Sequence, residues 1–156
     1  MITPNDIADV IQEKVEKAFP DEPVYRDLTP AGFKRPSTLI VYSEGICRPN
    51  FACGVVEMRP VFTLMGFVPV DAYSQSHLSA LNRKQHLLLS LFLPGFLCVG
   101  DRAPKVGNEI KLDGGYDFTA IDVPIIYTLN REEFMDLPQY EPMTHLHIRT
   151  EVTSHG

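Results

Sequence analysis

Residues 55–68 read VVEMRPVFTLMGFV, and this stretch decides the fold class. Its alternating apolar residues are Val56, Met58, Phe62 and Leu64. The other parity begins with the charged residues Glu57 and Arg59. A period of two is typical of an antiparallel strand that rests one face on a hydrophobic core. Because Pro60 has no N–H group for a strand ladder, it predicts a bulge or an edge strand at this point.

A second long strand is predicted over residues 118–129, where the same alternation recurs. One face of it carries Ile121, Val123, Ile125, Tyr127 and Leu129. Pro124 again indicates an edge or a bulge. Shorter strands are predicted at residues 24–27, 38–43, 96–99 and 109–112. The run Asp113-Gly114-Gly115 is typical of a tight turn.

Two helices accompany these strands. The first is predicted to begin after Thr3, a good N-cap residue followed by Pro4, and to end at Pro20. The second is predicted to begin at Asp71 and to end at Pro94-Gly95. Its apolar stripe is formed by Leu78, Leu81, Leu88 and Phe92. Further leucines near its end widen this stripe, so we expect burial on two sides, by its own sheet or by a neighbouring subunit.

Length and composition indicate one soluble α+β domain over residues 1–156. The chain is 44% hydrophobic and 22% charged, which suffices for a single core. A formal charge of −6 without a basic cluster argues against specific nucleic-acid binding. The N-terminal residues lack a signal-peptide pattern, and the most apolar stretch, residues 87–99, is too short to span a bilayer. We therefore expect a cytoplasmic protein without membrane contact.

The strongest metal-ligand pattern is His145-x-His147-x3-Glu151, in a predicted last strand over residues 144–152. Alternate strand positions place these side chains on one face, so a metal-dependent enzyme is one alternative. However, Gln139 stands where cupin-like metal strands have glycine, and the sequence leaves no room after Glu151 for the remaining barrel strands. We expect a solvated polar face and no metal.

Other chemistry has little support in the sequence. The three cysteines, whose spacing matches no zinc site and whose number is odd, are Cys47, Cys53 and Cys98. We expect buried or idle thiols and no disulfide scaffold. Phosphate-binding glycine loops and nucleophile elbows are absent, so we predict no catalytic residue and no cofactor.

Apolar residues in exposed segments predict a partner-binding surface. Residues 44–53, which contain Pro49 and Asn50, are predicted to be an exposed loop. Residues 130–143 are predicted to be an arm outside the core, bounded by prolines. The predicted interface residues in the loop, the arm and the end of the second helix are Phe51, Phe134, Met135, Leu137, Tyr140 and Phe92.

Several short motifs resemble those of phage tail terminator proteins from phages and prophages of Gram-positive bacteria. They are Phe19-Pro20, Pro23-Val24-Tyr25, Ala31-Gly32-Phe33, Pro36-Ser37 and Tyr116-Asp117-Phe118. The order of predicted helices and strands is also similar over residues 3–129. The chain departs from the family at residues 55–60, where an arginine-plus-aromatic pattern is expected, and beyond Leu129, where it is longer.

The resemblance implies a tail-terminator-like fold, with helices packed on an antiparallel or mixed sheet. It also implies a homo-oligomeric ring of six subunits on the head-proximal end of the tail tube. Such a ring binds the tail tube protein and a neck or head-completion protein, and DNA passes through its lumen. The protein is then expected in the host cytoplasm during assembly and in the virion tail. Another neck or tail-completion component is the alternative, because fold does not fix function.

Overall fold

The computed structural model describes residues 1–135 of the chain, which form three helices and a six-stranded sheet. The helices are α1 (Pro4–Ala18), α2 (Leu78–Ser90) and α3 (Arg131–Met135). The strands are β1 (Val24–Arg26), β2 (Ser37–Ala52), β3 (Val55–Phe67), β4 (Lys105–Val106), β5 (Lys111–Gly114) and β6 (Thr119–Asn130). The predicted α+β class is confirmed.

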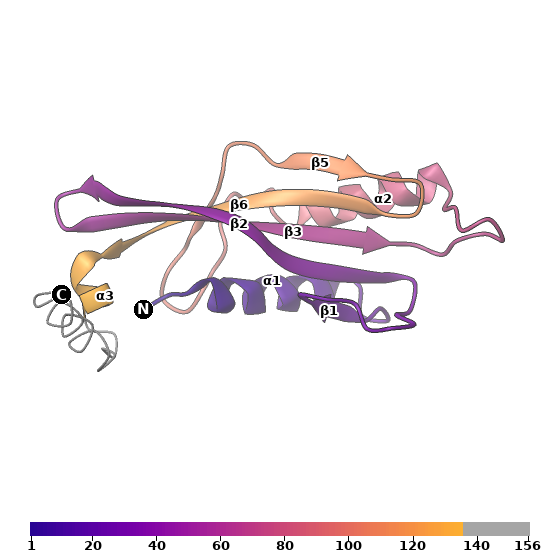
Figure 1. Cartoon of the computed structure of the whole chain (residues 1–156), viewed down its shortest axis with the longest axis horizontal. Helices are drawn as coiled ribbons and strands as arrows, with labels where there is room; N and C mark the ends of the chain where they lie inside the picture. Colours follow the sequence, from indigo (N-terminus) through magenta and orange to yellow (C-terminus); the bar gives the residue numbers. More distant parts are fainter. Residues whose placement is uncertain (136–156) are drawn as a thin grey trace, which may run out of the picture.

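The sheet is mixed. Its strand order is β1-β2-β3-β6-β4, and β5 also pairs with β6. β1 runs parallel to β2, whereas the other pairs are antiparallel. In Figure 1 the β2–β3 hairpin forms the left-hand extremity of the described chain, and α1 lies beneath the sheet.

Both long helices lie on the same face of the sheet, which we call the helix face. From β3 and β6 it presents Phe62, Leu64, Ile121, Val123 and Ile125. These residues form one buried core with Ile7, Ile11 and Val15 of α1 and Leu88 of α2. The opposite face, which we call the outer face, presents the half-buried residues Val61, Thr63, Asp122, Pro124 and Ile126. The alternation predicted for the two long strands is therefore confirmed.

α1 begins as its sequence predicts. Thr3 Oγ1 accepts a hydrogen bond from the Asp6 backbone N–H at 3.4 Å, and the Asp6 carboxylate accepts one from the Thr3 N–H at 2.8 Å. This reciprocal capping satisfies two N–H groups that the helix cannot pair internally. The helix ends at Ala18, just before Pro20.

The predicted loop at residues 44–53 is wrong, because β2 continues to Ala52 and pairs with β3. Gly45 lies opposite Pro60, and Cys47 lies opposite Met58. A two-residue turn, Cys53-Gly54, joins the strands, and Gly54 has a φ of +68°. Some tight turns require a left-handed conformation at their second central residue, and glycine adopts it without strain.

The second helix starts later than predicted. α2 begins at Leu78, which is exposed and does not belong to the buried stripe. The Asp71 carboxylate instead accepts hydrogen bonds from the backbone N–H groups of Tyr73 and Gln75. This local bonding closes a turn and competes with helix formation. The predicted strand at residues 96–99 is also wrong, since it forms only isolated bridges.

Neither proline of the long strands marks a sheet edge. β3 lies between β2 and β6, and its pairing with β6 is interrupted at Arg59 and Pro60. Pro124 lies where the outer neighbour of β6 changes from β5 to β4. The bulge in the hairpin lies on β2, beside Ser43. Both prolines therefore occupy breaks in a ladder, where the missing N–H costs little.

Candidate interaction surface on the hairpin

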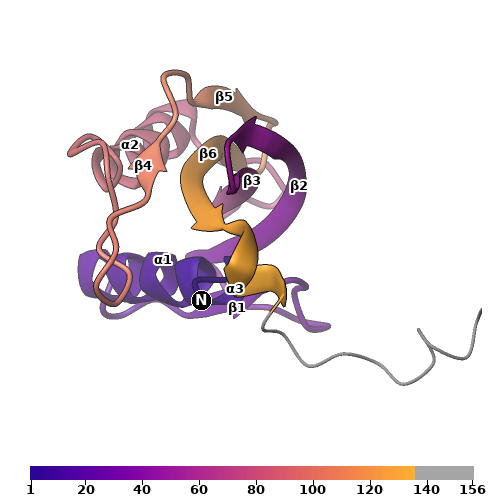
Figure 2. The ribbon, with the colours of Figure 1, turned by 90° about the vertical axis from the view of Figure 1, so that its left-hand side faces the viewer.

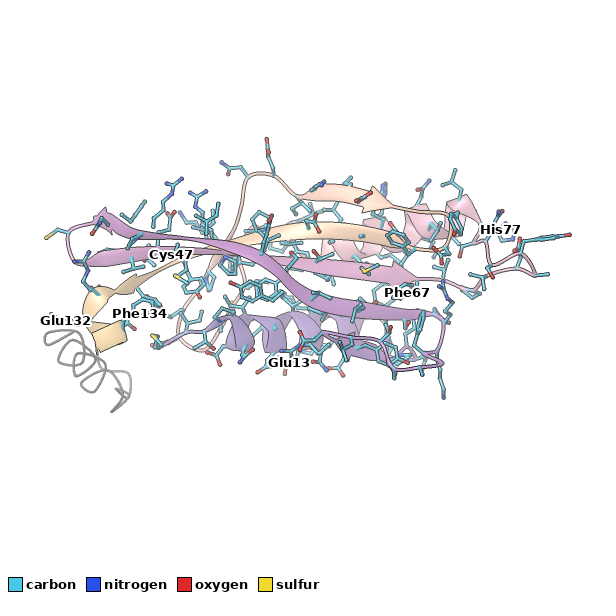
Figure 3. All side chains as sticks on the ribbon, in the orientation of Figure 1. Glu13, Cys47, Phe67, His77, Glu132 and Phe134 are labelled. Carbon is cyan, nitrogen blue, oxygen red and sulfur yellow. The ribbon has the colours of Figure 1, made fainter. Side chains whose placement is uncertain are left out.

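The outer half of the β2–β3 hairpin exposes its β2 strand to solvent, whereas Val56 and Glu57 of β3 are buried. We call residues 44–59 the hairpin tip. Every β2 residue from Glu44 to Ala52 is exposed, although all of them are in a strand. Figure 3 shows Cys47 on this tip and His77 at the opposite end of the long axis. On the β3 side the sheet continues, since residues 55–58 pair with residues 127–130 of β6, so β2 is the exposed outer strand of the tip.

A bulge in β2 turns the side chain of Ile46 to the outer face. Before Ser43, Val41 lies opposite Thr63 on the outer face. After it, Ile46 lies opposite Arg59, and the parity of β2 has changed. One extra residue moves all following side chains to the other face. As a result Ile46 is on the outer face, where it is 63% exposed.

A three-residue ionic cluster lies beside Ile46. The Glu57 side chain is only 6% exposed, and its Oε1 accepts from Arg59 Nε at 2.6 Å. Arg48 Nε is 3.7 Å from the same oxygen, and the Arg48 side chain is 54% exposed. Two guanidinium groups thus share one carboxylate. The cluster leaves one positive charge on the outer face of an acidic chain.

An open hollow of about 530 Å³ adjoins the cluster. It lies between the hairpin tip and residues 101–105, and Phe51, Glu57, Pro104 and Ile126 contribute to its lining. Phe51 is 48% exposed. The outer face of the tip therefore combines Ile46, a positive charge and a recess that Phe51 helps to line.

α3 braces the tip from the end of β6. Arg131 Nη2 donates to the Pro49 carbonyl oxygen at 2.9 Å and to Asn50 Oδ1 at 2.7 Å, and the Arg131 backbone N–H donates to the Gly54 carbonyl at 2.8 Å. The open edge of β2 carries Pro49 and two register irregularities. These features oppose the addition of a further strand, so a partner would contact this tip through side chains.

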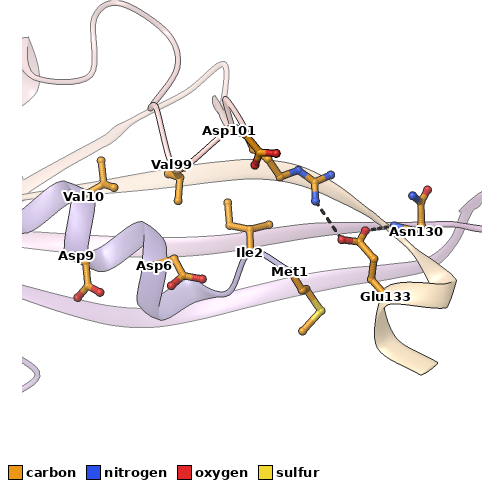
Figure 4. A pocket seen from close by; sticks show the side chains of 11 residues that line it. Met1, Ile2, Asp6, Asp9, Val10, Val99, Asp101, Asn130 and Glu133 are labelled. Atoms are coloured by element: carbon orange, nitrogen blue, oxygen red, sulfur yellow. Dashed lines mark hydrogen bonds and ion pairs between the residues drawn. The ribbon is translucent and has the colours of Figure 1, made fainter. Parts of the chain in front are cut away.

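A second open hollow, of about 760 Å³, lies at the start of α1 (Figure 4). Its acids serve the fold: Asp9 pairs with Arg26 at 2.8 Å, and Glu133 accepts from Arg102 at 3.4 Å and from the Asn130 N–H at 2.7 Å. These bonds fasten α3 and the loop at residues 99–102 to the sheet. We assign no binding role to this hollow.

Burial shifts the pKa of two groups next to the core. It raises the pKa of Tyr127 to about 12, and Tyr42 and Asp6 add smaller effects of the same sign. It lowers the pKa of Lys84, while a hydrogen bond and electrostatic attraction from Glu22 act in the opposite direction. Neither group belongs to the exposed surface of the tip.

The predicted interface residues differ in how exposed they are. Phe51 is exposed on the hairpin tip. Phe92 is only 1% exposed, and its prediction as an interface residue is wrong, because it packs inside the core of its own chain. The start of the predicted arm is also wrong, since residues 131–135 form α3 and Phe134 is half-buried against the core. Met135 ends α3, and Leu137 and Tyr140 lie outside the described residues.

The candidate metal ligands His145, His147 and Glu151 also lie outside the described residues. Within residues 1–135, no group of three His, Cys, Asp or Glu side chains is arranged to hold a metal ion. The sequence predicts buried or idle thiols; the free thiols of Cys47, Cys53 and Cys98 are all exposed, so the buried alternative is wrong.

Sequence reasoning missed three residues of this surface: Ile46, Arg48 and Arg59. The strand that carries Ile46 and Arg48 was predicted as a loop. It contains Gly45, Pro49 and Asn50, and these residue types are typical of loops. The available signal was the two-residue Cys53-Gly54 segment between two stretches that can pair.

Within the described part of the chain, no helix is long and apolar enough to cross a membrane. A comparison with models of known protein families gives no match, and a comparison with curated proteins gives none either.

Proposed function

We propose that this chain is a structural protein of phage tail assembly, a tail terminator that closes the head-proximal end of the tail tube. In this role it forms a ring of six subunits, contacts the tail tube protein on one side and joins a neck protein on the other. The resemblance of residues 3–129 supplies the identity and the stoichiometry. It acts in the host cytoplasm during assembly and afterwards in the virion tail.

The observation that carries the proposal is the hairpin tip. Its residues Ile46 and Phe51 are large, apolar and exposed, and they lie on a stretch of β2 in which every residue is exposed. Exposed apolar groups beside an arginine are typical of protein–protein contact sites. A structural protein of an assembly needs exposed contact sites of this kind to bind its partners.

The arrangement of surfaces suits a ring. A closed cyclic assembly uses heterologous contacts, in which each subunit offers two different surfaces to its two neighbours. The tip is one such surface, and it lies at the opposite end of the long axis from α2 (Figure 1). The net charge of −6 also suits a lumen through which DNA passes without binding.

The experiment is co-sedimentation of the purified chain with tail tubes built from the tube protein of the same phage or prophage. The double variant Ile46→Asp, Phe51→Asp should lower the bound fraction about tenfold, because burying two carboxylates in an apolar contact is costly. The control is Leu28→Asp, at an exposed leucine in the turn after β1.

Wild type and the Leu28 variant are expected to sediment equally with tubes. Failure of the wild type to bind tubes, or equal binding by the double variant with its fold intact by circular dichroism, contradicts the proposal.

A further inference from the structure

A second exposed apolar surface lies at the end of α2. We call Leu87, Leu93 and Phe96 the α2-end patch. Leu93 is 71% exposed, and Leu87 and Phe96 are each nearly half exposed. The three lie within ten residues of chain, on the last turns of the helix and the turn that follows. Large exposed apolar side chains on one short segment are typical of a contact site.

The helix end also favours a positive charge. The last carbonyl groups of an α-helix carry a partial negative charge, which lysine or arginine often compensates. α2 has no basic residue in its last turn. Some of its carbonyls have local donors, since Ser90 Oγ donates to the Leu87 carbonyl and the Leu91 N–H donates to the carbonyls of Leu88 and Leu89. None of these donors is charged, so the end remains suited to a cation.

The hairpin tip has the complementary chemistry. Ile46 and Phe51 match an apolar patch, and the hollow beside Phe51 can receive a projecting side chain such as Leu93. Arg48 is only loosely paired with Glu57, at 3.7 Å, and most of its side chain is free to reach a partner. Its charge suits the uncompensated helix end.

The two surfaces point in different directions. Ile46 lies on the outer face of the sheet, whereas α2 packs on the helix face. Figure 2, which looks along the molecule from the hairpin end, shows α2 and β2 on opposite sides. Ile46 and Arg48 therefore face away from the α2-end patch of their own chain. A contact between them must join two copies and leave one free surface at each end.

We propose that the hairpin tip of one copy docks on the α2-end patch of the next copy, with Arg48 at the end of α2. This inference rests on the proposed function and names the contact by which its ring is built. Because the contact is heterologous, it propagates from subunit to subunit until the rotation closes.

The native cysteines provide the test. Cys47 and Cys53 lie on the hairpin tip, Cys98 lies two residues after Phe96, and all three are exposed. A short bis-maleimide cross-linker applied to the concentrated, tube-bound chain should join a tip cysteine of one copy to Cys98 of the next. The expected product on a denaturing gel is a ladder of covalent oligomers. Cys98→Ser should abolish the ladder, and so should the double variant Cys47→Ser, Cys53→Ser.

A second variant tests the contact without cysteine chemistry. Leu93→Asp should weaken self-association about tenfold in sedimentation equilibrium, whereas Leu28→Asp should leave it unchanged. Because Leu93 is mostly exposed, the substitution should not alter the melting temperature.

The outcomes separate this inference from the proposed function. If the wild type binds tubes but Cys98→Ser still gives the ladder, the proposed ring still stands, and the proposed contact between the hairpin tip and the α2-end patch is wrong. Cross-linked dimers joined through Cys47 or Cys53 alone would show an isologous tip-to-tip contact and also overturn it. If the wild type neither binds tubes nor self-associates, the proposed function fails as well.

Discussion

Replacing Glu22 by glutamine should destabilise the fold, because it leaves a buried ammonium group without its anion. The Lys84 side chain is 4% exposed, and its Nζ donates to Glu22 Oε1. The same Nζ lies 3.8 Å from the centroid of the Phe19 ring. This contact joins α2 to the segment after α1, so losing the charge of Glu22 affects the packing of both helices.

The size of the effect follows from the burial of the pair. Removing one partner of a fully buried ion pair costs about 3–5 kcal/mol. Glu22 is 20% exposed, glutamine can still accept one hydrogen bond, and the Phe19 ring still faces the cation, so we expect about 2 kcal/mol at pH 7. For a domain of this size the melting temperature then falls by about 4–8 °C.

The assay is a thermal melt followed by circular dichroism, with Glu16→Gln as the control at an exposed carboxylate of α1. Lys84→Met should cost less than Glu22→Gln, since it removes the buried charge and leaves a carboxylate that can turn to water. The opposite order, or a Glu22→Gln melt equal to that of wild type, refutes the reasoning.

The pH dependence gives a further check. Burial lowers the pKa of Lys84 in the folded chain below its usual 10.5. Between the lowered pKa of Lys84 in the folded chain and its usual pKa of 10.5 in the unfolded chain, the unfolded chain binds more protons than the folded chain. The free energy of unfolding therefore increases with pH over this range. The deficit of Glu22→Gln should therefore shrink from pH 7 towards alkaline pH. A deficit that grows in urea titrations over this range contradicts the assignment.

Tyr127→Phe should remove one tyrosine that ionises near pH 12 in an absorbance titration, and it should lessen the loss of stability above pH 10, because a raised phenol pKa favours the protonated fold. Leu88→Ala, at a fully buried residue, should cost about 2–5 kcal/mol in urea unfolding. Gly54→Val should cost about 1–2 kcal/mol in the same assay, because φ is +68° there. Arg131→Ala should speed amide hydrogen exchange around Pro49 and Asn50 while leaving the melting temperature within about 2 °C of wild type.

The core strands and the start of α1 could be predicted from the sequence, because residues close together in the chain determine them. The apolar parity of residues 121–129 faces the core, and Thr3 and Pro4 start α1. Both signals rest on a few neighbouring residues, through strand alternation in one case and helix capping in the other.

The hairpin tip and the start of α2 were not predicted, because long-range pairing and local bonding decide them. Gly45 and Pro49 disfavour a strand locally, yet Gly45 pairs with Pro60 of β3, and Pro49 lies in an irregularity between the paired residues Arg48 and Ala52. Asp71 has the side chain of a helix cap, but it bonds the N–H groups of a turn. Phe92 was assigned to an interface because the end of α2 is apolar, and only the packed structure shows that its own core covers it.

The central claim is that this chain caps a tail tube as a closed ring. Its most direct test is electron microscopy of tail tubes assembled with and without the purified chain, together with light scattering of the chain alone over a concentration series. We expect a weakly associated chain in isolation, a ring-shaped cap of six subunits at one end of each tube, and tubes that stop growing once capped. A stable dimer that ignores tubes, an open filament, or tubes that lengthen unchanged in its presence would contradict the account.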